Sequence, residues 1–280
     1  MTETSESTTS YETLLVDDDG GVRTVTLNRP PRNEFTWQLG GELHHALGAA
    51  EADDSVRVVV VTGAGDFFCA GAALGRRRDG SGASAAGERP ATTDADRVLP
   101  WEMSTPIIAA INGPAVGVGL TLPLQWDIRI AAEDAKMGLV FIRRGWVAEL
   151  GAHWVLPRLI GVSKAMDLML TGRIFTGREA AEMGLVSQAL PAAEVLPAAQ
   201  EMAHMIAEKC APVSVAITKK LIWQMLEEPD HAKAQATDGK LYRWTTQQPD
   251  SREGVSSFLE KRTPQWTMSK TKDLPPELSS

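Results

Sequence analysis

The chain has 280 residues, 43% of them hydrophobic, and a formal net charge of −8. This length allows one large domain or two small ones, and the hydrophobic fraction is ample for a buried core. The acidic balance argues against non-specific binding to nucleic acid, which requires a basic face.

The composition also limits the cofactors and the compartment. Cys69 and Cys210 are too few for a disulfide framework, and no residue spacing is typical of a metal site or a redox cofactor. Residues 1–10 are polar and acidic, do not form a secretory signal, and are expected to be disordered. No apolar stretch approaches membrane-spanning length. We therefore expect a cytoplasmic protein that holds no metal and does not bind membranes.

The first expected elements follow the spacing of the apolar residues. Short alternating runs on both sides of Gly20 and Gly21 predict a β-hairpin over residues 11–28. Apolar residues at helical spacing between Phe35 and Ala50 predict an amphipathic helix. Strands are predicted at residues 56–62, 107–111 and 128–131, the first two of them buried on both faces.

A loop and two helices are expected between these strands. The stretch Arg76–Asp94 is rich in Gly, Ser, Ala and Arg and predicts a loop. A short helix is expected near Leu99–Met103, and another begins at about Gly117. Because strands alternate with helices, the pattern implies an α/β fold with right-handed βαβ connections.

Beyond residue 190 the pattern becomes helical. Pro212 and Pro229 separate three helical stretches, which we expect at residues 192–210, 213–226 and 232–246. The last residues, 267–280, are polar and rich in proline, and we expect them to form a tail.

Two segments rich in small residues carry most of the functional information. Phe68–Leu74 and Asn112–Gly119 each follow an apolar run, and their Gly and Ala residues let the backbone turn tightly and present free N–H groups. Two such corners can hold one negatively charged oxygen, which is what an oxyanion hole requires. Tight chain packing explains either segment alone equally well, whereas the two together favour a functional role.

These segments, with Leu170–Val186 and Gly254–Arg262, make the chain resemble the crotonase, or enoyl-CoA hydratase/isomerase, superfamily. The resemblance runs from about residue 22 to about residue 266. It implies a spiral of ββα units over residues 11–190 and a C-terminal helical trimerisation region over residues 191–266. It also implies an acyl-CoA thioester substrate and a homotrimer or a dimer of trimers.

The resemblance assigns the two amides of the oxyanion hole to Ala72 and Val118. Only the backbone N–H is required, so a valine in place of the usual glycine keeps the donor while narrowing the pocket. We expect Val118 in the first turn of the helix that follows, where unpaired amides and the helix dipole favour negative charge.

The acid–base groups depart from the hydratase pattern. Hydratases of this family carry two glutamates where this chain has Thr121 and Phe141. Glu149 instead aligns with the single catalytic glutamate of one branch of Δ3,Δ2-enoyl-CoA isomerases. Moving a double bond requires only one base, which takes a proton from C2 and returns it at C4. Glu149 is therefore predicted to be the proton shuttle.

Other interpretations of these residues remain open. Glu149 can have a structural role at a helix start, paired with Arg143 or Arg144. A water held by Thr121 is compatible with a 2-enoyl-CoA hydratase. The loss of both hydratase glutamates is also compatible with a catalytically silent acyl-CoA-binding protein.

The remaining polar candidates are assigned weaker roles. His153 and Asp127 are expected to be structural, Asp127 by tethering the backbone at a strand entrance, and Cys69 to be a buried hydrophobe. No cofactor is expected beyond the coenzyme A portion of the substrate. The resemblance places the segment after the first hairpin near the adenine and phosphates of coenzyme A, and it implies that the fourth segment reaches the nucleotide from a neighbouring subunit. The residues predicted to bind coenzyme A are Arg32, Asn33, Phe35, Ala70, Gly71, Phe258 and Lys261.

Overall fold

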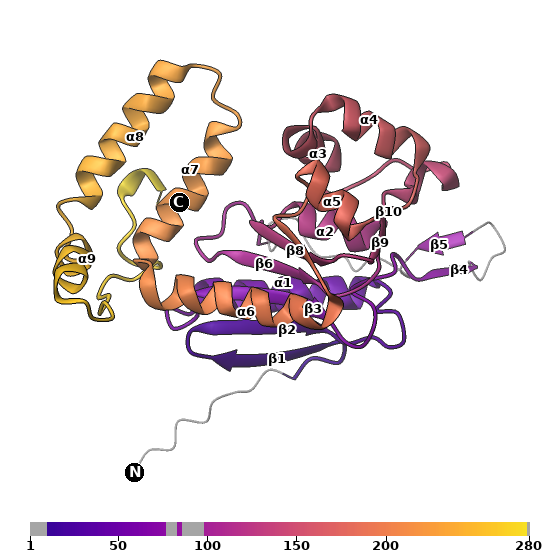
Figure 1. The fold of residues 1–280 in the computed structure, drawn as a ribbon, viewed down its shortest axis with the longest axis horizontal. Helices are drawn as coiled ribbons and strands as arrows, with labels where there is room; N and C mark the ends of the chain where they lie inside the picture. Colours follow the sequence, from indigo (N-terminus) through magenta and orange to yellow (C-terminus); the bar gives the residue numbers. More distant parts are fainter. Residues whose placement is uncertain (1–9, 77–82, 86–97, 279–280) are drawn as a thin grey trace, which may run out of the picture.

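The computed structural model describes residues 10–76, 83–85 and 98–278. Figure 1 shows an α/β core from which the C-terminal helices α7, α8 and α9 project on one side. The core contains a six-stranded sheet in the order β1-β2-β3-β6-β8-β11. The strands of this sheet are β1 Leu14–Asp19, β2 Val22–Leu27, β3 Val58–Gly63, β6 Ile107–Ile111, β8 Ile128–Ala132 and β11 Gln188–Leu190.

The expected hairpin and strands are confirmed. β1 pairs antiparallel with β2 across the turn at Gly20 and Gly21, whose φ angles of 55° and 82° favour glycine. The other neighbours in the large sheet pair in parallel. β3 and β6 are buried along their whole length, as their apolar runs predict.

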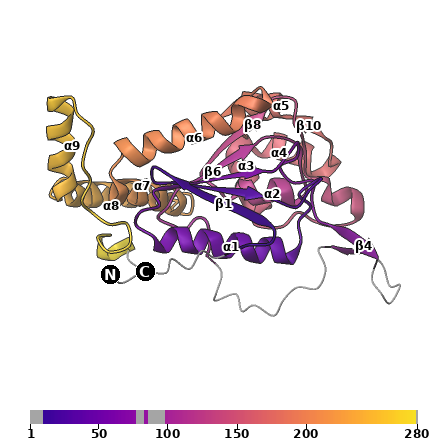
Figure 2. The same cartoon turned by 90° about the horizontal axis from the view of Figure 1, so that it is seen from below.

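Helices cover both faces of the large sheet, as Figure 2 shows for α1 and α6. α1 spans Trp37–Ala52 and begins where the Thr36 side chain accepts the N–H of Leu39 at 3.2 Å. α6 spans Ala192–Lys209 and buries a stripe of small residues against the sheet, namely Val195, Ala199, Ala203 and Ala207. Both helices confirm their predicted positions, and the core lies between them.

Shorter elements build the upper part of the core in Figure 1. β7, β9 and β10 form a three-stranded sheet, and β4 pairs with β5. α5 begins with a capping box in which Thr176 and Glu179 satisfy each other's backbone N–H groups. The bounds are β4 Leu74–Arg76, β5 Ala83–Ala85, β7 Ala115–Val116, α2 Val118–Leu124, β9 Lys136–Gly138, η2 Val140–Arg144, α3 Ala152–Ile160, α4 Val162–Thr171, β10 Phe175–Thr176 and α5 Gly177–Met183.

Two local predictions differ from the structure. Leu99–Met103 forms a turn and not a helix, because the Glu51 carboxylate accepts the next two amides, Ser104 and Thr105, at 2.8 and 2.9 Å. The expected loop over Arg76–Asp94 lies mainly outside the described residues. Where it is described, residues 83–85 pair with β4 as a strand.

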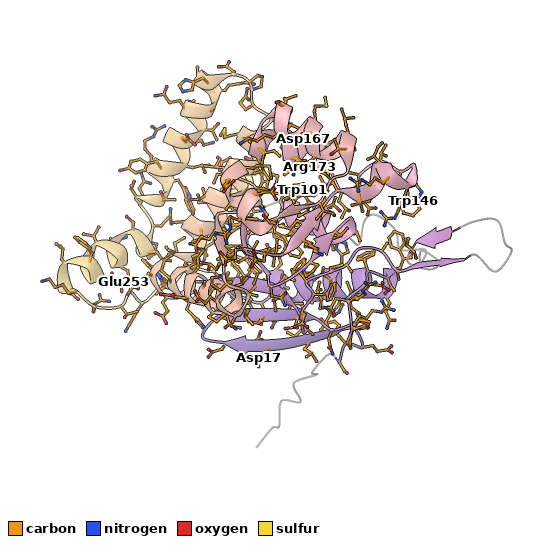
Figure 3. All side chains as sticks on the ribbon, turned by 45° about the vertical axis from the view of Figure 1, so that its right-hand side comes forward. Asp17, Trp101, Trp146, Asp167, Arg173 and Glu253 are labelled. Carbon is orange, nitrogen blue, oxygen red and sulfur yellow. The ribbon has the colours of Figure 1, made fainter. Side chains whose placement is uncertain are left out.

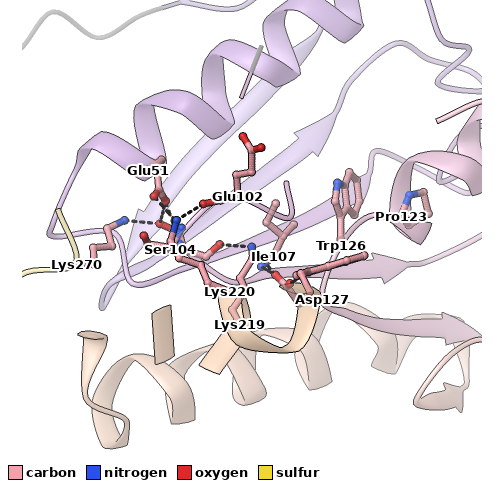
Figure 4. Close-up of polar contacts among 12 residues, drawn as sticks. Glu51, Glu102, Ser104, Ile107, Pro123, Trp126, Asp127, Lys219, Lys220 and Lys270 are labelled. Atoms are coloured by element: carbon pink, nitrogen blue, oxygen red, sulfur yellow. Dashed lines mark hydrogen bonds and ion pairs between the residues drawn. The ribbon is translucent and has the colours of Figure 1, made fainter. Parts of the chain in front are cut away.

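The three C-terminal helices that proline spacing predicted are confirmed, and a fourth follows them. Polar contacts tie this region to the core, and Figure 4 shows Lys219 of α7 paired with Asp127 at 2.8 Å. Lys270 donates to the Ala50 carbonyl at 2.7 Å and to the Thr105 hydroxyl. Burial lowers the pKa of Lys270 to about 8. The tail therefore packs on the core. The helices are α7 Pro212–Met225, α8 His231–Thr245, α9 Pro249–Glu260 and the 3-10 turn η3 Pro276–Leu278.

Candidate functional site

The two small-residue segments lie side by side in the core. On one side of residues 69–73, Phe35 donates its N–H to the Gly71 carbonyl at 2.8 Å and accepts the N–H of Ala73 at 2.9 Å. On the other side, Cys69 accepts the N–H of Val116 at 3.0 Å. Residues 69–73 are therefore sandwiched between the chain at Phe35 and the start of the second segment.

This pairing fixes the direction of the Ala72 amide. The backbone groups of successive residues in an extended chain point to alternate sides. Gly71 O and Ala73 N are used on the Phe35 side, so Ala72 N–H points to the opposite side, toward the segment that contains Val116. Residues 117 and 118 continue that segment.

Glycines allow the two segments to approach so closely. A Cβ at Gly119 would lie 2.2 Å from the Cys69 carbonyl oxygen, and a Cβ at Gly71 would lie 3.0 Å from the Val116 oxygen. Gly71 and Gly117 also have positive φ angles of 102° and 58°. A side chain at Gly119 or Gly71 would force the corners apart, and the backbone conformation at Gly71 and Gly117 disfavours other residues, so packing and function require the same residues here.

The two predicted amides are free to bind a ligand as far as the described residues show. Val118 is the first residue of α2, where an N–H has no partner within the helix. No hydrogen bond from Ala72 N or Val118 N to a protein acceptor occurs within the part of the chain that the structure describes. Val118 is 4% exposed, so an anion bound to its amide would be shielded from water.

The positions that carry glutamates in hydratases hold residues that cannot replace them. Thr121 is fully buried, and its hydroxyl donates to the Val118 carbonyl at 3.4 Å, which leaves no exposed surface at which to hold a water. The ring of Phe141 faces Gly117, with Cζ 3.9 Å from a Cβ built there. Both side chains therefore shape the site and do not supply acid or base.

Glu149 lies in the irregular stretch between η2 and α3, and its carbonyl accepts the N–H of Ala152 at 3.1 Å. The side chain is exposed, yet enough protein surrounds the carboxyl that desolvation raises the pKa of Glu149 above the ordinary glutamate value. Trp146, three residues earlier, lies at the same end of the molecule as the β4–β5 hairpin, which follows Ala72 (Figure 3).

The ion pair considered for Glu149 is not observed. Arg143 donates to the Thr171 carbonyl at 3.0 Å and Arg144 to the Val140 carbonyl at 3.3 Å. Within the described ranges, neither arginine pairs with Glu149, and the carboxylate has no hydrogen-bond partner. The backbone at the next residue, Leu150, has a φ of 54°, which is uncommon outside glycine. Strained backbone of this kind clusters at functional sites.

The three weaker candidates behave as expected or stay untested. Cys69 is fully buried, and burial raises the pKa of its thiol to about 11, so it is a core side chain. Asp127 accepts the N–H of Ile107 at 2.7 Å at the entrance of β6, which confirms the tether. His153 is exposed on α3 and lines a small apolar cavity with Phe141 and Trp146.

The residues predicted to bind coenzyme A fall into two groups. The Asn33 amide is fully used, because it donates to the Ala64 and Phe67 carbonyls at 2.9 and 2.6 Å and accepts from Arg29 N at 2.9 Å. It therefore shapes the corner through buried contacts. Arg32 is exposed beside Phe67, with Cζ 5.8 Å from the ring centroid. Arg32, Asn33, Phe35, Ala70 and Gly71 all lie at the first corner.

Phe258 and Lys261 belong to the other group. Phe258 is 81% exposed on α9, and Lys261 ends that helix with a φ of 55°. Figures 1 and 2 place α9 at the opposite end of the molecule from β4, so one chain does not bring these residues to its own corner. This separation agrees with the predicted contribution to a neighbouring subunit.

The larger cavity beside the site was not anticipated from the sequence. It has a volume of about 630 Å³ and lies between the start of α3, α7 and the η3 turn, with Gln125, Leu150 and Trp101 in its wall. The apolar cavity beside Phe141 is smaller, about 250 Å³. Ala72, Val118 and Glu149 line neither cavity.

Within the described residues, each helix is too short or too polar to span a membrane. Among the same residues, no group of histidine, cysteine and acidic side chains is arranged to hold a metal ion.

An α/β core that presents two unpaired amides at adjacent glycine corners is suited to stabilising an oxyanion. The family model for enoyl-CoA hydratase/isomerase matches residues 17–269. The chain belongs to this family, the crotonase superfamily, as its motifs predicted. The family processes acyl-CoA thioesters, and the protein is an enzyme of this kind.

Curated relatives carry more than one activity. An enoyl-CoA hydratase of Alternaria alternata is 38% identical over 94% of this chain and 89% of its own length. The 1,2-epoxyphenylacetyl-CoA isomerase of Escherichia coli (strain K12) is 34% identical over 91% of this chain and 98% of its own. The crystal structure of an enoyl-CoA hydratase from Bacillus anthracis matches with a TM-score of 0.79, at 32% identity, over 91% of this chain and 99% of that one.

Proposed function

We propose that the protein is a Δ3,Δ2-enoyl-CoA isomerase in which Glu149 is the single proton shuttle. The amides of Ala72 and Val118 hold the thioester carbonyl oxygen. Glu149 removes a proton from C2, and the electron pair delocalises onto that oxygen and toward C4. The protonated Glu149 then returns the proton at C4, which leaves the double bond between C2 and C3.

The observation that carries this proposal is the state of the Glu149 carboxyl. It has no hydrogen-bond partner within the described part of the chain, and desolvation raises its pKa above the ordinary glutamate value, which makes it a stronger base. Thr121 and Phe141 supply no second carboxylate for the activation of water. One base is enough for an isomerase, whereas a hydratase must activate water and also deliver a proton.

Hydration of a 2-enoyl-CoA is the second candidate function. Its support is the name of the Alternaria relative, while the Escherichia coli relative is named an isomerase. Glu149 would have to activate water and protonate the product alone. The buried, internally bonded Thr121 offers no help with the water.

We also propose a homotrimer or a dimer of trimers that works in the cytoplasm without a resident cofactor. The support is the exposed α9, which carries Phe258 and Lys261 far from the corner of its own chain. In an assembly, these two residues of one protomer would contact the coenzyme A bound by its partner.

The proposal is tested by measuring two reactions on the same protein. Wild-type protein is given a 3-enoyl-CoA and, separately, a 2-enoyl-CoA, and the products are identified by chromatography. We expect isomerisation of the first to exceed hydration of the second. In Glu149→Gln, isomerisation falls by about 100-fold to 10,000-fold, while binding of a saturated acyl-CoA is kept.

Glu201→Gln is the matched control, because Glu201 is an exposed glutamate on α6. It is expected to retain wild-type turnover. Undiminished isomerisation in Glu149→Gln would overturn the role of Glu149. Hydration that exceeds isomerisation in the wild type would favour the second candidate.

A further inference from the structure

The larger cavity is lined by residues of the same two segments that carry the proposed catalytic residues. Leu150, the residue after Glu149, lines it, and so does Gln125, the residue that ends α2. α2 starts at Val118, whose amide faces the thioester oxygen in the proposed function. The seven residues of α2 span about 10 Å at 1.5 Å per residue. An acyl chain bound at the catalytic corner would have to run along α2 to reach this cavity.

Gln125 is the unusual polar group in the cavity wall. Only 6% of its surface is exposed, and its side-chain amide has no hydrogen-bond partner in the described parts of the chain. The polar atoms of the Gln125 side chain are not completely enclosed by protein, and the residue lines the cavity, so these atoms reach the cavity space. A largely buried amide without a protein partner favours a ligand or a water that supplies the missing hydrogen bond.

Aromatic side chains form another part of the wall. Trp154 of α3 stacks on Trp223 of α7, with ring centroids 6.2 Å apart and an interplanar angle of 20°. Both rings line the cavity, as does Trp101, which Figure 3 labels near the centre of the molecule. Because the Arg158 guanidinium lies over Trp154, 3.9 Å from the ring centroid, Trp101 and Trp223 are the rings left to pack against a flat ligand ring.

The remaining wall is charged. Lys220 donates to the Glu102 carbonyl at 2.5 Å, and both residues line the cavity together with Glu227. Burial lowers the pKa of Lys220. A wall of tryptophans interspersed with polar groups differs from the smaller cavity beside Phe141, whose lining is almost wholly apolar.

We infer that this cavity binds the far end of a ring-bearing, oxygenated acyl group, with Gln125 hydrogen-bonded to the oxygen. The inference rests on the proposed function, because it places the thioester at Ala72 and Val118. The volume of about 630 Å³ lies in the range of about 300–1,000 Å³ typical of whole small-molecule sites and exceeds the needs of a narrow linear tail. A plain fatty tail would also leave Gln125 without a partner, and a site built for a polar group rejects the analogue that lacks it.

The test compares the binding of saturated acyl-CoA thioesters, which the enzyme does not turn over, by calorimetry. The probes are butanoyl-CoA, decanoyl-CoA, naphthyl-hexanoyl-CoA and hydroxynaphthyl-hexanoyl-CoA. We expect the wild type to bind the hydroxynaphthyl compound roughly ten-fold tighter than the naphthyl compound, because one buried hydrogen bond distinguishes them. Decanoyl-CoA is expected to bind more weakly than either ring compound.

Gln125→Met keeps the side-chain length and removes both polar atoms. In this variant the preference for the hydroxyl should vanish, while binding of butanoyl-CoA, which is too short to reach the cavity, is unchanged. Gln247→Leu, an exposed glutamine beyond α8, should retain the wild-type preference.

The outcomes separate the two proposals. If butanoyl-CoA binds but the wild type does not distinguish the hydroxynaphthyl from the naphthyl compound, or prefers decanoyl-CoA, this inference is wrong and the proposed function stands. If no acyl-CoA binds, the proposed function itself fails. The wild-type comparison needs no variant, so a folding defect in Gln125→Met does not leave the inference untested.

Discussion

The two parts of the proposed site are built in opposite ways. The corners at Ala72 and Val118 lie in the core and are fixed by backbone hydrogen bonds and by glycines that no larger residue can replace. The stretch that carries Glu149 is exposed and irregular, and it turns through Gly145, Leu150 and Gly151 with positive φ angles.

This difference separates two tasks. Stabilising an enolate oxygen requires two amides at fixed positions, and only the folded core can hold them so rigidly. Which reaction is catalysed depends on the position of the carboxylate. An exposed loop can change its side chains at small cost to the stability of the fold. Relatives with hydratase and isomerase names are expected on such a framework.

Within the core, the largest effect on both activity and stability is expected from breaking the corner with Gly119→Ala. The added Cβ would lie 2.2 Å from the Cys69 oxygen, a backbone atom that cannot move alone. We expect kcat/KM to fall at least about 100-fold and the free energy of unfolding to fall by roughly 3 kcal/mol. Steady-state kinetics and denaturant unfolding measure the two effects.

Gly41→Ala is the control, because nothing lies within 4 Å of a Cβ at that position in α1. It should raise the free energy of unfolding by about 0.5–1 kcal/mol, as alanine does in an exposed helix. A Gly119→Ala variant with normal kinetics would show that the corner is not as rigid as its contacts indicate.

A smaller effect is expected from pH. Glu149 must be ionised to act as a base, and desolvation raises its pKa. Activity should therefore fall as the pH drops through a value above the ordinary glutamate pKa of about 4.3. The acid limb of the kcat/KM profile measures this value. An acid limb at or below the ordinary pKa would contradict a desolvated base.

Much of the fold and part of the site could be predicted from the sequence. β3 and β6 are continuous apolar runs that only a doubly buried strand accommodates, and the small-residue segments indicate the corners. The turn at Leu99–Met103 could not be predicted, because Glu51, far away in sequence, accepts the amides that follow it. The unpaired amide of Gln125 likewise depends on which elements surround it in space.

The melting temperature of Glu149→Gln tests whether the loop glutamate is desolvated in the folded protein. The folded state raises the pKa of Glu149. The free energy of unfolding therefore falls as the pH rises through that pKa and the carboxyl ionises. Glutamine removes this cost, and the variant should melt at a higher temperature than the wild type at neutral pH. The difference should shrink below the ordinary glutamate pKa, where the carboxyl is protonated in both states. Equal melting temperatures at neutral pH would argue against the desolvation.

The smallest effect is expected from His153→Ala. His153 is exposed on α3 and is assigned no step in the reaction. We expect kcat to change by less than about two-fold, since exposed substitutions away from the chemistry have small effects. A loss of 100-fold would mean that the loop uses a second acid–base group.

The most direct test of the account is a crystal structure with a saturated acyl-CoA thioester bound. We predict that the thioester oxygen lies about 2.7–3.1 Å from the nitrogens of Ala72 and Val118, and that the Glu149 carboxylate faces C2 and C4. A thioester oxygen away from both amides, or a Glu149 carboxylate turned into solvent, would contradict it.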